Sequence, residues 1–283
     1  MPLVSLKPIL AEAERRNAAC LGLVCLGWED VRAYASAAEE VGAPLVLSAG
    51  PGARAHMPIS VWGSMFKAIA EEFSVPVVAH LDHGKSLDEC KYALDAGFTS
   101  LMIDGSLLSL DDNIKLSSSV CELVVGSDIS VEAELGMVGY ENGNKSQITR
   151  PEEVEKFLSS VNCDCLAVSI GNSHLQVKQK AVIDWAGVSA IRQATDLPLV
   201  IHGGSGVKQS DRERLAREFG VRKFNVGTEL RQAFGEGLRD YIATEVETFD
   251  RIKILTGAAN FVSNKASHIL KDNWNNDSAL KLF

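Results

Sequence analysis

The chain has 283 residues, of which 46% are hydrophobic, and its mean hydropathy of +0.04 fits a protein with a sizeable buried core. This length accommodates one large α/β domain or two small ones. Its 28 basic and 37 acidic residues give a net charge of −9. Nucleic acid or an anionic membrane would repel such a chain, so we expect neither as a partner. A small anionic substrate is still compatible with this charge, because it needs only a local cluster of donors.

The start of the chain and its apolar runs give no indication of export or membrane insertion. Residues 1–7 lack a basic start followed by a long apolar core. No apolar run approaches the roughly 20 residues that a membrane-spanning helix needs. The six cysteines are scattered without a C-x-x-C pair, which is typical of structural thiols in a reduced compartment. We therefore expect a cytoplasmic protein.

Eight apolar runs recur at intervals of roughly 25 to 35 residues, and segments of helical periodicity fill the gaps between them. The expected strands are residues 21–27, 43–48, 75–81, 100–104, 130–135, 165–170, 198–202 and 221–226. The clearest helical segments are residues 30–40, 60–73, 87–96 and 211–219, and Ser86 and Ser109 precede acidic residues as helix caps do.

Near-continuous Val/Ile/Leu strands that alternate with helices indicate a parallel sheet covered by helices. Eight such strands favour an α/β fold of the (β/α)8 type, the TIM barrel, over a doubly wound sheet. A doubly wound sheet normally carries a Gly-rich fingerprint after its first strand, and residues 22–30 lack it. We expect a single domain over residues 1–283, with a barrel over about 6–247 and a helical extension over 248–283. After Thr228 the chain is expected to continue as helix through Glu247.

Histidines gather where the expected strands end, at the face of a barrel where chemistry is placed. His80 and His83 lie at the end of the third strand, His174 follows the sixth strand, and His202 ends the seventh. Three imidazoles with an open coordination position are the donor set of a catalytic zinc site. We predict His83, His174 and His202 as the metal ligands; the alternative is a set of unrelated histidines at the barrel rim.

The carboxylates near these histidines have separate predicted roles. Asp82 stands at the same strand end and is our candidate proton-transfer group. His80 shares the face of Asp82, opposite His83 while the strand stays regular, and we interpret it as a hydrogen-bonded core histidine. Asp104 and Glu134 interrupt apolar strands, and buried carboxylates need partners. They are predicted to orient the ligands or to hold a second or displaced metal position; a structural ion pair with a lysine is the alternative.

Two glycine-containing segments predict a phosphate site at the last two strand ends. Glycines let backbone N–H groups approach an anion, and hydroxyl groups add donors. Such cradles are common after the seventh and eighth strands of barrels. The candidate residues are Gly203, Gly204, Ser205, Asn225, Val226, Gly227 and Thr228.

Four segments resemble motifs of the class II, zinc-dependent ketose-bisphosphate aldolases, which include fructose- and tagatose-bisphosphate aldolases. They are Ala-His-Leu-Asp-His-Gly (79–84), Gly-Phe-Thr-Ser-Leu-Met-Ile-Asp-Gly-Ser (97–106), Ser-Val-Glu-Ala-Glu-Leu-Gly (130–136) and His-Gly-Gly-Ser-Gly-Val (202–207). The resemblance runs from about Leu6 to Phe234.

The resemblance implies a metal-dependent aldolase that reversibly cleaves a phosphorylated ketose to dihydroxyacetone phosphate and an aldehyde. One catalytic Zn²⁺, with a second or monovalent cation possible, would stabilise the enediolate, and Asp82 would move the proton of the C4 hydroxyl. Glu141, in a long loop, is the candidate for protonating the enediolate. Ser48 and Lys178 are further candidate substrate contacts. Members of this family are often homodimers or homotetramers, and the C-terminal helices are a plausible contact.

Three departures from the family pattern concern the substrate. The family usually has His-Gly-x-Tyr where residues 174–177 are His-Leu-Gln-Val, and Ala-Phe-Asn where residues 23–25 are Leu-Val-Cys. The acidic pair of the mobile loop is Glu141-Asn142 here. Two alternatives therefore stay open: the same zinc chemistry on a different ketose or sugar-acid phosphate, and a non-catalytic sugar-phosphate-binding homologue.

Overall fold

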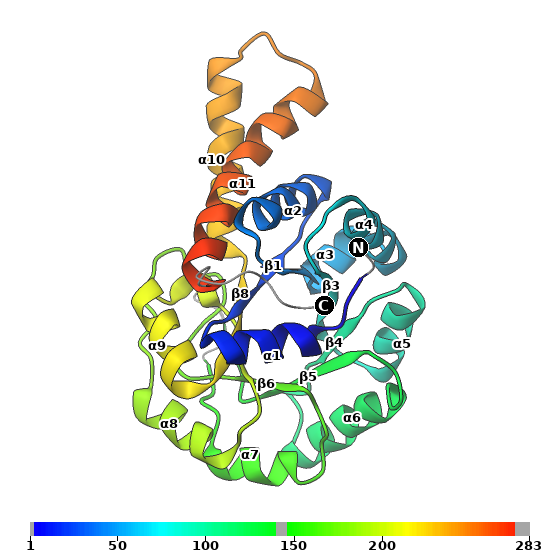
Figure 1. The fold of residues 1–283 in the computed structure, drawn as a ribbon, viewed down its shortest axis with the longest axis vertical. Coiled ribbons are helices and arrows are strands. Elements are labelled where there is room, and N and C mark those ends of the chain that lie inside the picture. Colours follow the sequence, from blue (N-terminus) through cyan, green and yellow to red (C-terminus); the bar gives the residue numbers. More distant parts are fainter. Residues whose placement is uncertain (1–2, 140–145, 275–283) are drawn as a thin grey trace.

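The computed structural model describes residues 3–139 and 146–274. Eight parallel strands pair in chain order, and β8 pairs with β1, so the sheet is a closed barrel. The strands are β1 Cys20–Val24, β2 Leu45–Ala49, β3 Val77–Gly84, β4 Ser100–Ile103, β5 Ser130–Leu135, β6 Cys165–Val168, β7 Leu199–Ile201 and β8 Val221–Val226. This arrangement confirms the predicted (β/α)8 barrel (Figure 1).

Helices surround the barrel and connect its strands (Figure 1). They are α1 Leu6–Arg16, α2 Trp28–Val41, α3 Pro51–His56, α4 Ile59–Glu72, α5 Leu87–Asp95, α6 Leu110–Leu123, α7 Pro151–Leu158, α8 Trp185–Ala194, α9 Gln209–Phe219, α10 Thr228–Thr244 and α11 Arg251–Trp274. The predicted caps are confirmed, because Ser86 Oγ accepts from Glu89 N and Ser109 Oγ accepts from Asp112 N, both at 3.2 Å.

Several expected boundaries were wrong; β1, for example, ends at Val24 instead of residue 27. For β3 and α10 a local reason is visible. β3 begins at Val77 instead of residue 75, after Pro76, which has no N–H to donate to a neighbouring strand. It also continues through Gly84, three residues beyond the expected end. α10 ends at Thr244 instead of Glu247, where Glu245 leaves the helical region with a ψ of 55°.

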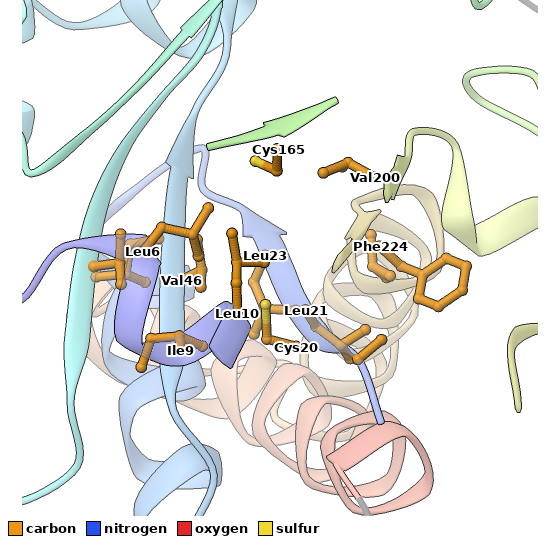
Figure 2. Packing of buried hydrophobic residues seen from close by; sticks show 14 of the residues in the cluster. Leu6, Ile9, Leu10, Cys20, Leu21, Leu23, Val46, Cys165, Val200 and Phe224 are labelled. Carbon is orange, nitrogen blue, oxygen red and sulfur yellow. The ribbon is translucent and has the colours of Figure 1, made fainter. Parts of the chain in front are cut away.

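The N-terminal helix α1 covers the end of the barrel opposite to the predicted site. The backbone N of Leu6 donates to Ser130 Oγ at the start of β5, and Val4 N donates to Val77 O at the start of β3. Leu6, Ile9 and Leu10 belong to the same buried core as the strand residues (Figure 2). The apolar face of α1 therefore seals the bottom of the barrel, and the top remains for polar groups.

The C-terminal helices α10 and α11 form a hairpin whose tip extends beyond the barrel (Figure 1). α11 packs along α2 and α10. Its C-terminal Trp274 is buried, and the guanidinium carbon of Arg16 lies 5.1 Å from the Trp274 ring centroid. None of the helices in the described part of the chain combines the length and apolar character needed to cross a membrane.

A substitution at Gly63 tests the close packing between α4 and the end of α5. A Cβ at Gly63 would lie 1.9 Å from the carbonyl oxygen of Ala96, which is backbone and has little freedom to move. We expect Gly63→Ala to lower the free energy of unfolding by about 1–3 kcal/mol, the usual cost of overpacking, although alanine is the better helix former. Thermal unfolding measures this. The control is Gly52→Ala in α3, where a Cβ meets nothing within 4 Å; equal stability of the two variants would contradict the prediction.

Candidate active site

β3 ends in a distorted segment that turns two adjacent side chains toward the mouth of the barrel. The backbone φ of His83 is 51°, a left-handed value uncommon for residues other than glycine. The register with β4 also shifts between Leu81 and Gly84. The strand is thus irregular where the sequence interpretation assumed a regular one. Asp82 and His83 line the same cavity as a result.

The imidazoles of His83, His174 and His202 meet at this end of the barrel. One ring nitrogen from each lies within 4.8 Å of those of the other two. The ring centroids are 4.6 Å apart for His83 and His202, 5.3 Å for His83 and His174, and 5.8 Å for His174 and His202. Burial, with the two other rings nearby, lowers the pKa of His174 to about 3, so this imidazole is neutral at pH 7. The structure brings the three predicted ligands together.

Asp104 contacts both a histidine and a lysine, the two kinds of partner considered for it in the sequence. Its Oδ2 lies 2.7 Å from His83 Nδ1 and 2.5 Å from Lys85 Nζ. Burial lowers the pKa of His83, but the negative charges of Asp82, Asp104 and Glu134 outweigh it and raise that pKa to about 9. The carboxylates of Asp104 and Glu134 beside Nδ1 thus give this side of the imidazole a strongly negative surrounding, which suits a cation.

Two buried atoms in the cluster have no hydrogen-bond partner among the described residues: His202 Nδ1 and Glu134 Oε2. Glu134 Oε2 lies 3.9 Å from His202 Nδ1 and 3.4 Å from His83 Nδ1. A buried polar group left without a partner costs about 1–3 kcal/mol. His83, Asp104 and Glu134 also form a second group whose ligand atoms lie within 4.8 Å of one another. Imidazole nitrogens with nearby carboxylates are donors that zinc prefers, so these residues fit a divalent metal ion.

Asp82 is held from the far side of the barrel by Asn225. The Nδ2 of Asn225, in β8, donates to Asp82 Oδ1 at 2.9 Å. Burial raises the pKa of Asp82, but His83, His202 and His80 outweigh that effect and lower it. Asp82 is therefore an ionised carboxylate that can accept a proton.

The turn after β7 and the start of α10 place backbone donors side by side. Gly203 has a φ of 62°, and a Cβ there would lie 2.2 Å from Ser173 O, so only glycine fits. Ser205 Oγ accepts from the backbone N of Gly227 and of Glu229, both at 3.3 Å. Helix N-termini carry partial positive charge and bind phosphate. A cavity of about 250 Å³ connects this turn with Asp82, His83 and His174.

Comparisons with known proteins agree with this geometry. Residues 4–277 match the family model described as fructose-bisphosphate aldolase class-II. The chain belongs to the class II fructose-bisphosphate aldolase family. As a member it is an aldolase, a carbon–carbon lyase, which confirms the resemblance and the enzyme class predicted from the motifs.

Individual relatives of this aldolase match over nearly their whole length. It is 37% identical over 262 residues to a fructose-bisphosphate aldolase of Geobacillus stearothermophilus, which covers 90% of this chain and 91% of that protein. Identity to a fructose-bisphosphate aldolase of Staphylococcus aureus is 32% over 284 residues, 96% of this chain and 97% of that one. The crystal structure of the YdjI aldolase from Escherichia coli K12 superposes with a TM-score of 0.86 at 28% identity, covering 98% of this chain and 100% of that chain.

The remaining predicted site residues of the aldolase lie at varying positions around the cavity. Gly227 and Thr228 line it with Gly203, Ser205 and Asn225. Four other candidates do not line the cavity: Ser48, Lys178, Gly204 and Val226. Ser48, Gly204 and Val226 are buried, and Ser48 Oγ has no hydrogen-bond partner among the described residues. Lys178 is exposed on its loop. Glu141 lies outside the described residues.

Two arginines at the site were missed by the sequence interpretation. Arg54, in α3, donates from Nη1 to Asp82 O at 2.6 Å and from Nη2 to His83 O at 3.1 Å, so it holds the distorted end of β3. Arg231, in α10, lines the cavity one helical turn after Thr228. It also lines an adjoining, mainly apolar cavity of about 430 Å³. Pro51, a typical first residue of a helix, could have indicated the short helix that carries Arg54. Arg231 could have been found because it lies one helical turn after Thr228.

Leu175 has an unusual conformation for its residue type. Its φ is 57°, where the family usually has glycine, and its half-exposed side chain lines the cavity. A left-handed backbone costs a residue other than glycine about 1–2 kcal/mol. The departure noted in the sequence therefore changes the cavity wall directly beside His174.

A substitution at Gly22 in β1 tests whether the Asn225 side chain has to be held in place for Asp82 to work. A Cβ at Gly22 would lie 2.5 Å from Asn225 Oδ1. We expect Gly22→Ala to displace the Asn225 amide from Asp82 and to lower kcat by about 100-fold, the usual effect of a misplacement of about 1 Å. Steady-state kinetics measure kcat, and metal content should not change. Gly235→Ala, whose Cβ meets only the end of the Arg239 side chain, is the control; equal kcat for both variants would disprove the coupling.

Proposed function

We propose that this aldolase binds one zinc ion through His83, His174 and His202 and cleaves a phosphorylated ketose to dihydroxyacetone phosphate and an aldehyde. The observation that carries the proposal is the convergence of the three imidazoles, whose ligand nitrogens lie within 4.8 Å of one another. Beside them, His202 Nδ1 and Glu134 Oε2 are buried without a hydrogen bond among the described residues. Three protein ligands leave a coordination position for substrate. A bound zinc would act as the Lewis acid that stabilises negative charge on the ketose carbonyl oxygen.

The chain's own residues supply the proton transfer and the substrate orientation. Asp82, ionised and held by Asn225, accepts the proton of the C4 hydroxyl as the C3–C4 bond breaks, and returns it in condensation. The turn at Gly203 and the N-terminus of α10 bind the phosphate. Glu141 is our candidate for protonating C3 of the three-carbon product. The group formed by His83, Asp104 and Glu134 is proposed as an alternative or second cation position.

A different ketose or sugar-acid phosphate is the second candidate substrate. It is favoured by the altered wall at Leu175 and by the apolar cavity that adjoins the site at Arg231. Leu175 lies next to His174, and Arg231 lies one helical turn after Thr228, so both features shape the cavity wall beside the proposed phosphate-binding residues. The choice between ketoses thus depends on this wall, while the chemistry depends on the histidines and Asp82.

Metal removal with substrate screening tests the proposal. Purified protein is expected to contain about one zinc per chain, to lose cleavage activity on chelation and to regain it when zinc returns. A panel of phosphorylated ketoses, assayed for dihydroxyacetone phosphate release, identifies the substrate.

Asp82→Asn provides the matched variant, because it keeps the size of the side chain and removes its basicity. We expect it to bind zinc normally and to lose at least about 100-fold in kcat, the lower range for general base catalysis. Protein without bound metal, or full activity in the presence of chelator, would refute the zinc aldolase; a non-catalytic homologue would bind phosphate without releasing product.

We also propose that the enzyme works as a single domain in the cytoplasm, as a homodimer or homotetramer. All six cysteines are unpaired thiols, which suits a reducing compartment. The single domain is supported by α11, which packs on α2 and α10 instead of on a core of its own. The tip of the α10–α11 hairpin exposes Ile242, Val246, Phe249 and Ile252, and clustered exposed apolar side chains mark contact surfaces.

Oligomerisation through this tip is testable by one substitution. Phe249 is 95% exposed at the tip, so a charge there should not disturb the fold. We expect Phe249→Asp to shift the protein from a dimer or tetramer toward monomer in sedimentation velocity runs, with unchanged thermal stability of the barrel. Val125→Asp, at another exposed apolar residue, should leave the assembly intact. A monomeric wild-type protein at every concentration would refute the proposed assembly.

A further inference from the structure

Glu132 lies inside the barrel directly beneath the histidine cluster. Its side chain is fully buried, and each carboxylate oxygen has a different partner. Oε1 lies 3.0 Å from His202 Nε2, and Oε2 lies 2.8 Å from Lys223 Nζ. His80 Nε2 approaches Oε2 at 3.8 Å. The carboxylate of Glu132 therefore links His202, a proposed metal ligand directly after β7, with a buried lysine in β8.

The contact with Glu132 determines which nitrogen of His202 faces the cavity. An ionised carboxylate can only accept hydrogen bonds, so His202 Nε2 carries the proton and donates it to Glu132. The lone pair is then on Nδ1, the atom that lies on the Glu134 side of the ring and has no partner among the described residues. A carboxylate behind a histidine ligand in this way also fixes the orientation of the ring.

Lys223 is a charged side chain in the interior of the barrel, where apolar residues are the usual filling. Its side chain is fully buried. The nearest partners of Lys223 Nζ are Glu132 Oε2 at 2.8 Å and His80 Nε2 at 3.4 Å. Exchanging a buried ion pair for apolar residues of similar volume is often neutral or stabilising. The lysine does, however, neutralise the Glu132 carboxylate and occupies the oxygen that does not contact His202. Glu132 is thereby held in place for the histidine.

We propose that Glu132 and Lys223 form a positioning pair that holds the His202 ring with its Nδ1 lone pair directed at the metal ion. The pair touches neither substrate nor reacting atoms, so it acts only through His202. This inference rests on the proposed zinc centre.

The test separates metal affinity from stability in a double variant. In Glu132→Leu with Lys223→Met both buried charges disappear together, so no unpaired charge remains. We expect the metal-free double variant to unfold at or above the wild-type temperature. Its zinc dissociation constant, measured by competition with a chromophoric chelator, should rise about 10- to 100-fold, as for other lost partners of metal-bound histidines. A role in folding alone would lower the unfolding temperature and leave the zinc dissociation constant as it was.

Two further variants complete the test. Glu132→Gln keeps the shape of the side chain, and should weaken zinc binding because a neutral amide is a poorer acceptor; it carries the test if the double variant does not fold. Ser100→Ala removes the 2.8 Å contact between Ser100 Oγ and His80 Nδ1, and should leave zinc affinity unchanged. Wild-type zinc affinity in the folded charge variants would overturn the positioning pair alone. A wild-type protein that binds no zinc would instead refute the metal centre.

Discussion

Pairing between β1 and β8 is the constraint on which the rest of the structure depends, because it closes the barrel. Gly22 of β1 lies opposite Asn225 of β8, and the Asn225 amide reaches across to Asp82 at the end of β3. Closure also brings His83, His174 and His202 together from three separate strand ends. An open sheet of the same strands would place these groups along an edge, where no single ligand could contact them all.

The interior of this barrel contains charge, which is unusual given the cost of burying ions. The arrangement is stable because opposite charges alternate from the barrel centre upward: Lys223 pairs with Glu132, and the histidine cluster is flanked by Asp82, Asp104 and Glu134. Burial raises the pKa of Glu132, yet Lys223 and His202 outweigh burial and lower it well below its ordinary value. The apolar residues of α1 close the bottom of the barrel, and Glu132 and Lys223 are fully buried above them.

Much of this architecture could be predicted from the sequence. The strands were recognisable because strands buried on both faces need near-continuous apolar runs, and the meeting of the histidines followed from the shared end of a barrel's strands. The orientation of His83 could not be predicted, since its left-handed backbone accompanies a register shift between β3 and β4 that its residue type does not indicate. Arg54 and Arg231 were missed because arginines on helices usually face solvent.

The contact between Glu132 and Lys223 could not be predicted from the sequence either. The two residues are 91 positions apart, and neither lies at a strand end, where the search for functional residues concentrated. Their proximity depends on the stagger of neighbouring strands around the barrel. Alternating side chains predict which residues point inward, but they do not give the height at which each one sits.

The order of the histidines along the chain has a consequence for biosynthesis. His202 directly follows the seventh of eight strands, and the Asn225 that holds Asp82 belongs to the eighth. A nascent chain that has not yet delivered residue 202 contains at most two of the three clustered imidazoles, however well its earlier units have formed. If the trio binds a metal ion as proposed, capture by all three imidazoles has to follow the synthesis of residue 202, so a chain truncated before that point lacks the complete site.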